Sequence, residues 1–281
     1  MERTCSRAVQ LGLKSLAFTD HVDLTRWAAH TDKIAPGFRA HIENGAVVAE
    51  PLDVAGYLEC LERCRGLFPD LQILSGVELS EPHLHSAQTR ELLSAASFDR
   101  VLGSVHSLED LDAHTDHERE VELRGVREEV HHAYAERAPL DVVRVYLAEV
   151  VTMAKSAESF SVLAHIDYPL RYWPASAGRF GPQLVEDEFR SALEAVASSG
   201  RSLEVNTRLP LAPQIVDWWY AAGGDSVTFG SDAHEPDRLA SEFTSTAAMV
   251  AAHGFRPGAT PYELWRRDGR RQSFRSPQAH I

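Results

Sequence analysis

The segment RVLGSVH at residues 100–106 is a short apolar run that ends in a histidine. Short apolar runs of this length predict buried strands. Five further runs of this kind lie at 15–19, 72–78, 161–165, 202–206 and 227–231. Between them, apolar residues recur at helical spacing, as at 54–68 and ahead of Gly200, a glycine suited to ending a helix. This alternation predicts an α/β fold with parallel strands, and six strands in one unit favour a barrel.

The organisation of the chain indicates one domain. No linker rich in Pro, Gly or Ser divides the 281 residues, so we expect a single barrel over 1–258 and a basic, irregular C-terminal tail over 259–281. The most polar stretch, 109–129, is expected to form a surface loop or a partly helical lid.

Composition narrows the function classes. Apolar residues make up 44% of the chain, as in an ordinary globular protein, and the formal net charge is −13. Such a surface repels a polyanion, so nucleic acid is not an expected partner. An anionic substrate therefore needs local positive charge, from bound metal ions or a few arginines. Three cysteines without a C-x-x-C, no signal pattern and no long apolar run predict a cytoplasmic protein that does not enter membranes.

Residues with metal-ligating side chains follow most of the expected strands. The strand ends read TDH at 19–21, GVE at 76–78, GSVH at 103–106, AHID at 164–167, EVNT at 204–207 and GSDAH at 230–234. The C-terminal ends of barrel strands converge on one face, so these side chains are expected to meet there. Imidazole and carboxylate groups suit Zn, Mn or Fe, and a carboxylate such as Glu78 can bridge two cations. The expected metal ligands are His21, Glu78, His106, His165, Asp232 and His234.

Other polar residues have simpler interpretations. Asp20 and Asp167 are expected either to cap a turn or to orient a ligand. His83 and His85 lie beyond the strand end at Glu78 and are expected in a loop. Cys60 and Cys64, four apart on a helix, are expected to pack in the core. Solvated surface is the expectation for the remaining histidines of the polar region, which are His114, His117, His131 and His132.

Together the segments TDH, GVE, FDRVLGSVH, VLAHIDYPLR, LEVNT and FGSDAH resemble the PHP superfamily, and within it the histidinol-phosphatase type. The resemblance covers about residues 15–254. It implies a distorted (β/α)7 barrel that binds up to three divalent ions and hydrolyses phosphate esters. By this resemblance Glu78 bridges two ions, His106 and His165 complete the second site, and Asp232 serves the first. His21 and His234 would serve the third ion.

Three further residues are expected at the substrate. Arg171 matches a position where the histidinol-phosphatase type carries a basic residue suited to phosphate. Arg208 and Asn206 are expected at the same mouth, where they either contact substrate or are structural. Glu78, His106, Asp232 and Arg171 are the residues expected to carry catalysis.

The sequence departs from the family at its start, where the family has a strand carrying H-x-H that this sequence lacks. Either the protein begins upstream of Met1 or the first metal has lost two imidazoles, and we favour an upstream start because a missing central strand exposes barrel edges.

Three functions remain open at this point. The first is hydrolysis of a small phosphate monoester, with L-histidinol phosphate as the favoured substrate. The second is hydrolysis of another sugar or nucleotide phosphate, or of a phosphodiester. The third is a degenerate PHP module that binds metal without catalysis.

Overall fold

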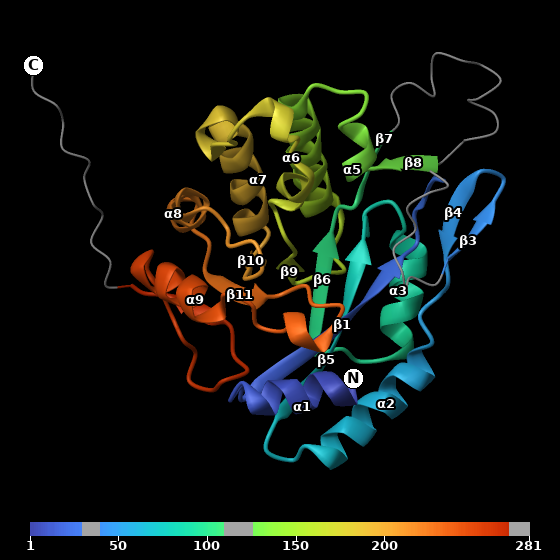
Figure 1. Ribbon diagram of the computed structural model, residues 1–281, viewed down its shortest axis with the longest axis vertical. Coiled ribbons are helices and arrows are strands. Elements are labelled where there is room, and N and C mark those ends of the chain that lie inside the picture. The colour runs from blue at the N-terminus through green and yellow to red at the C-terminus, as the bar shows by residue number, and fades with distance from the viewer. Residues whose placement is uncertain (30–39, 110–125, 270–281) are drawn as a thin grey trace, which may run out of the picture.

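The computed structural model describes residues 1–29, 40–109 and 126–269. The fold is α/β with two sheets (Figure 1). The larger sheet has the strand order β1-β5-β6-β9-β10-β11-β13-β12. Its parallel strands are β1 (Ser15–Asp23), β5 (Gln72–Ser80), β6 (Arg100–Ser104), β9 (Val162–Leu163), β10 (Ser202–Asn206) and β11 (Ser226–Gly230). The prediction of six parallel strands is confirmed.

Helices connect these strands and lie outside them. In Figure 1, α6 to α9 lie to one side of β1, β5 and β6, and α1 to α3 lie below and on the other side. The helices are α1 (Glu2–Gln10), α2 (Val54–Leu67), α3 (Ser86–Ala95), α5 (Val130–Ala133), α6 (Pro139–Ser156), α7 (Glu186–Ser198), α8 (Pro213–Ala221) and α9 (Phe243–Ala252). Short 3-10 turns span Tyr168–Tyr172, Ala175–Ala177, Pro182–Val185 and Pro236–Arg238. In the described residues, no helix is long and apolar enough to cross a membrane.

Local signals explain where several helices begin and end. Pro139 and Pro213 occupy the first turn of α6 and α8, where a missing N–H costs nothing. Asp53 caps α2 by accepting a hydrogen bond from the Gly56 N–H at 3.0 Å. Gly200 has φ +73° and ends α7 as predicted, with Arg201 N–H bonded to the Val196 carbonyl.

Two features of the sheet differ from the expected barrel. Among the described residues, no hydrogen-bonded strand pair joins β1 to the other end of the sheet, so the ladder stays open. That other end consists of two short antiparallel strands, β12 (Phe255–Arg256) and β13 (Trp265–Arg267). Strand β13 lies within the segment expected to be a tail, and it pairs with β11.

A second, five-stranded sheet was not predicted. It contains β2 (Arg26–Ala28), β3 (Ala40–Glu43), β4 (Ala46–Ala49), β7 (Ser107–Glu109) and β8 (Val126–Glu129). Strand β8 forms the described end of the polar stretch for which a loop or helical lid was expected, and residues 110–125 of that stretch lie outside the described residues. These strands are too short for a period-2 pattern to be distinguished from loop sequence.

The main core lies between α6, α7 and α8 and the strands β9, β10 and β11. A second cluster packs α1 and α2 against the start of β5, and Cys5 and Cys64 are buried in it, as expected for Cys64. Close packing reaches the strands themselves: a Cβ atom added to Gly103 of β6 would lie 2.5 Å from the Phe160 ring.

Replacing Gly103 with Ala is expected to lower the free energy of unfolding by about 1–3 kcal/mol, because the added methyl group overpacks against Phe160. Urea unfolding measures the change. Gly66→Ala is the control, since Gly66 lies in α2 with nothing within 4 Å of the added atom. The control should be neutral or stabilising, and equal losses in both variants would contradict the packing argument.

Candidate metal centre

The register of the parallel strands brings the expected ligands to one end of the sheet. His21 of β1 is the direct neighbour of Glu78 in β5, and Asp23 is the neighbour of Ser80. Neighbouring strands lie about 4.8 Å apart, so side chains at paired positions meet on the same face. His106 and His165 lie just beyond β6 and β9, and Asp232 and His234 just beyond β11.

Glu78 is the centre of the group formed with His106 and His165. Its Oε1 lies 2.7 Å from His165 Nε2 and 3.2 Å from His106 Nε2, and the two Nε2 atoms are 3.3 Å apart. All three could ligate a single ion, since one donor atom of each lies within 4.8 Å of the others. The short separations among three potential donors fit the N/O ligand chemistry of zinc and related metals.

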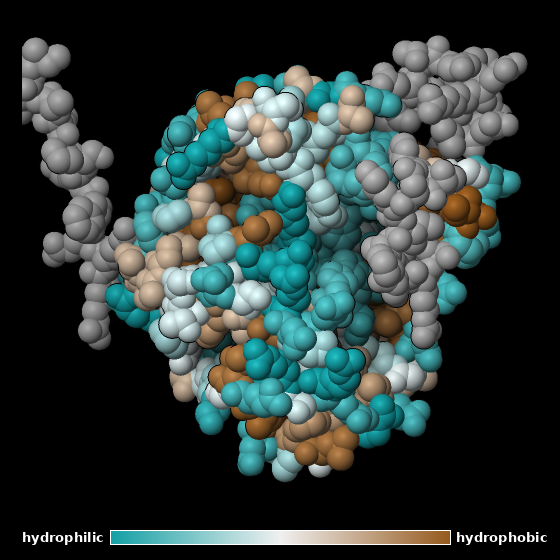
Figure 2. All heavy atoms as spheres, viewed as in Figure 1, coloured by the Kyte–Doolittle hydropathy of each residue, from teal (hydrophilic) through white to brown (hydrophobic). Residues whose placement is uncertain are grey.

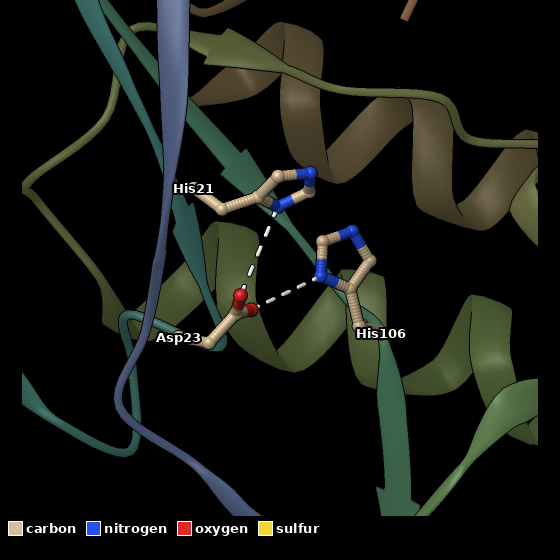
Figure 3. A group of neighbouring side chains, drawn as sticks. All are labelled: His21, Asp23 and His106. Carbon is tan, nitrogen blue, oxygen red and sulfur yellow. Dashed lines mark hydrogen bonds and ion pairs between the residues drawn. The ribbon is translucent and has the colours of Figure 1, made fainter. Parts of the chain in front are cut away.

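His21 belongs to two further groups. It lies with Asp23 and His106 in one, and with Asp232 and His234 in the other. Asp23 lies between the imidazoles, 3.9 Å from His21 Nδ1 and 3.4 Å from His106 Nδ1 (Figure 3). His21 Nε2 lies 3.3 Å from His234 Nε2. The structure therefore gathers all six expected ligands in one place.

Burial and charge act against each other at these groups. Burial alone would raise the pKa of Glu78, but the imidazoles of His21 and His165 outweigh it and hold that pKa well below its ordinary range. Burial lowers the pKa of His165, and the neighbouring Glu78 only partly offsets it. His106 behaves differently: burial would lower its pKa, but the carboxylates of Asp23 and Glu78 raise that pKa well above its ordinary value. This imidazole must therefore release its proton before it can ligate a metal. His165 Nδ1 is buried and has no hydrogen-bond partner within the described part of the chain.

Arg171 and the strand-end loops form the rest of the site. The Arg171 guanidinium is paired with the Asp232 carboxylate and lies 5.0 Å from the centroid of the Tyr168 ring. Its Nη2 is buried without a hydrogen-bond partner among the described residues. Asn206 Oδ1 accepts hydrogen bonds from the backbone N–H groups of Arg208 and Leu209, so this amide oxygen has a structural role.

Five of the ligand residues line a cavity of about 650 Å³, and these are His21, Asp23, His106, Asp232 and His234. Glu78 and His165 are buried and are not among its lining residues. Figure 2 shows a hydrophilic hollow on this face, where β5 and β6 end in Figure 1. Arg171, Arg208 and Asn206 line the same cavity. Its volume suits a small organic molecule.

The positions of His131 and His132 differ from those expected from the sequence. We expected both on the solvated surface, yet their side chains are only 20% and 15% exposed and both line the cavity. Their ring centroids are 3.8 Å apart. The short helix α5 and the preceding strand β8 turn these neighbours into the pocket together with Glu129, and a helical-face argument does not apply to one turn. All three could hold an ion together.

The remaining expectations have mixed outcomes. His83 lies 3.1 Å from Glu149 Oε1 and His85 Nε2 lies 2.9 Å from the Thr25 hydroxyl, and neither belongs to a candidate metal group. Asp167 occupies the N-cap position of the Tyr168–Tyr172 turn. Asp20 is exposed, and His114 and His117 lie outside the described residues.

Sequence reasoning missed Asp23, Glu81 and Glu204. Asp23 follows His21 by two residues, and in an extended strand that spacing puts both on one face, which was a usable signal. Glu204 lies inside β10, and its buried carboxyl group would collide with any side chain at Gly230. Burial, together with the negative charges of Glu78 and Asp232, raises the pKa of Glu204 to about 8.

Known proteins resemble this chain along most of its length. The family model for the PHP domain matches residues 1–208. The chain is 24% identical over 263 residues to the histidinol-phosphatase of Lactococcus lactis subsp. lactis, an alignment that covers 91% of this chain and 86% of that protein. It is 33% identical over 116 residues to the probable histidinol-phosphatase of Thermotoga maritima, covering 38% of this chain and 47% of that protein.

Two crystal structures share the fold. That of histidinol phosphate phosphatase from Lactococcus lactis, in complex with zinc, L-histidinol and phosphate, matches with a TM-score of 0.71 and 20% identity, over 90% of this chain and 87% of that one. That of the HisK protein from Listeria monocytogenes matches with a TM-score of 0.62 and 16% identity, over 87% of this chain and 92% of that one.

The carboxyl group of Glu204 predicts a pH dependence of stability. Its pKa rises from 4.5 to about 8 on folding, so the folded state holds the proton more tightly. This stabilisation is complete below pH 4.5 and is lost as the pH rises to 8, by up to about 1.4 kcal/mol per pH unit. In chelator-treated protein, Glu204→Gln should flatten the fall measured by urea unfolding. Glu59→Gln, at an exposed position of α2, is the control, and equal slopes in all three proteins would refute this assignment.

Proposed function

The chain belongs to the PHP domain family, and on that premise we propose that it is a metal-dependent phosphatase acting on L-histidinol phosphate. The observation that carries the proposal is the meeting of six metal-ligand side chains, four of which line one cavity together with two arginines. The curated relatives that are named histidinol-phosphatases support the choice of ester. The six parallel strands would then be strands of the distorted (β/α)7 barrel expected for this family.

The donor set fits divalent cations. It offers four imidazoles and three carboxylates in overlapping groups, and the buried Nδ1 of His165 remains without a hydrogen-bond partner among the described residues. We propose Zn, Mn or Fe, up to three ions, held by His21, Glu78, His106, His165, Asp232 and His234, with Asp23 as a further ligand. When bound, these ions supply a Lewis acid that activates water and neutralises phosphate charge.

The protein's own groups bind and orient the phosphate. Arg171 is the main group for this role, because burial would lower its pKa but Asp232 raises that pKa and keeps the guanidinium charged. Its Nη2 is buried without a hydrogen-bond partner among the described residues, and a phosphate oxygen would supply the missing acceptor. Arg208 and Asn206 line the same cavity and would add N–H donors. These groups would attract an anionic substrate locally, although the chain as a whole carries a net charge of −13.

The cavity lining also contains groups that suit the organic part of the substrate. They are the side chains of Trp27, Val47, Tyr172 and Leu209, and the carboxylate of Glu129. Histidinol carries an amino group and an imidazole, and a carboxylate next to flat apolar surfaces complements both. The cavity lining therefore combines groups that would bind an anion with a group that would bind a cation, and this ester carries both charges.

Phosphate release tests the proposal directly. Protein loaded with Zn, Mn or Fe should hydrolyse L-histidinol phosphate with a higher kcat/KM than sugar phosphates, nucleotides or p-nitrophenyl phosphate. Equal rates with histidinol phosphate and p-nitrophenyl phosphate would refute the substrate assignment. Metal-loaded protein that releases no phosphate from any ester would refute the enzyme assignment and favour a non-catalytic metal-binding module.

Glu129 predicts a specific loss of substrate recognition. Glu129→Gln should lower kcat/KM for L-histidinol phosphate by about 10- to 100-fold, the value of a hydrogen bond between charged groups. The kcat/KM for p-nitrophenyl phosphate, which has no amino group, should not change. Glu128→Gln is the matched control, since Glu128 contacts His132 at 3.4 Å but is not among the residues that line the cavity. A parallel loss with both substrates would contradict a role in binding the organic group.

A further inference from the structure

Glu81 is a buried carboxylate with an unusual backbone. It follows β5 directly, is 1% exposed, and has φ +44°. A residue with a side chain rarely adopts this left-handed conformation, because its Cβ atom crowds the backbone. Such conformations persist where surrounding contacts enforce them, and they concentrate at functional sites.

Three hydrogen-bond donors from two other segments hold Glu81 in this conformation. Glu81 Oε1 accepts the backbone N–H of His106 at 2.6 Å and that of Ser107 at 2.8 Å. Glu81 Oε2 accepts the hydroxyl of Thr25 at 2.7 Å. The Glu81 N–H donates to the Ser104 carbonyl at 2.9 Å, which ties the residue to the end of β6. Both carboxylate oxygens are therefore occupied by donors of the chain itself.

The two segments are those that carry Asp23 and His106. Thr25 follows Asp23 by two residues in the turn after β1, and the backbone N–H of His106 itself donates to Glu81. Asp23 Oδ1 lies 3.4 Å from His106 Nδ1, and the Ser80 hydroxyl bonds both residues. The Thr25 hydroxyl also lies 2.9 Å from His85 Nε2, which limits its rotation.

We propose that Glu81 is a positioning residue of the metal centre, which sets the distance between Asp23 and His106 by holding the turn after β1 and the turn after β6 on one carboxylate. The inference rests on the proposed function for the identity of the ligands. Glu81 contacts no ion in this scheme, and its role is geometric. A glutamine can fulfil the same role, because its amide oxygen can accept both backbone N–H groups and its NH₂ can donate to Thr25.

Zinc affinity provides the test. Glu81→Ala and Glu81→Gly remove the acceptor, and Gly also relieves the positive φ, so both should bind Zn²⁺ about 10- to 100-fold more weakly. Glu81→Gln should bind it like the unchanged protein. Equilibrium dialysis against buffered free Zn²⁺, with elemental analysis of bound metal, gives the midpoint concentration. Urea unfolding in chelator, measured on the same samples, reports folding separately.

Tyr57→Phe is the matched control. The Tyr57 hydroxyl also ties β1 to β5 through backbone bonds, from Gly76 N–H at 2.8 Å and to the Phe18 carbonyl at 3.0 Å, and it lies outside the candidate metal groups. Tyr57→Phe should unfold more easily but keep its zinc midpoint.

Several outcomes would overturn the proposal. They are an unchanged midpoint in Glu81→Ala, a loss in Tyr57→Phe as large as in Glu81→Ala, a loss in Glu81→Gln as large as in Glu81→Ala, and unchanged protein that binds no zinc. Phosphate release is assayed in parallel. Zinc midpoints that behave as expected in a protein that hydrolyses no ester would refute the proposed function and leave the positioning role in place.

Discussion

The carboxylate of Glu78, buried among imidazoles, is the interaction on which the arrangement of the sheet depends. A buried anion without such partners would be strongly unfavourable. Its partners come from β1 and from the segments after β6 and β9, with Oε1 2.7 Å from His165 and 3.2 Å from His106. A shift of one residue in the pairing of β1 with β5 would turn His21 to the opposite face. The register of β1 against β5 therefore also decides whether His21 can balance the charge of Glu78.

That requirement explains why polar residues concentrate at one end of an otherwise apolar sheet. The strands run through buried positions such as Ile73, Leu163 and Leu203, which pack under the helices. Only the carboxyl ends, and the turns beyond them, carry groups that need charge partners. Stability comes from the apolar length of each strand, and the chemistry is confined to its last residues, as in other folds built from parallel strands with helical crossovers.

Much of this arrangement could be predicted from the sequence. The six parallel strands and the gathering of ligands from His21 to His234 follow from apolar runs that end in His, Asp or Glu, because parallel strands share a direction. The small sheet could not be predicted, since strands of three or four residues carry too little pattern. Glu81 could not be found either, because its role depends on a positive φ and on donors about 25 and 56 residues away along the chain. The pocket position of His131 and His132 depends on how β8 pairs with β2 and β7, which is long-range information.

The hairpin-like pair β12 and β13 has a consequence for how the molecule behaves in concentrated solution. An outer strand with free N–H and C=O groups invites other molecules to add strands and aggregate. Here β11 is covered by β13, and the outermost strand, β12, has only two residues, one of them Arg256. Arg266 and Arg267 lie beside it, and two of these arginines pair with carboxylates, Arg256 with Asp268 and Arg266 with Asp225. An added strand would find only two residues to pair with, among charged side chains, which protects this side of the sheet against intermolecular β-pairing.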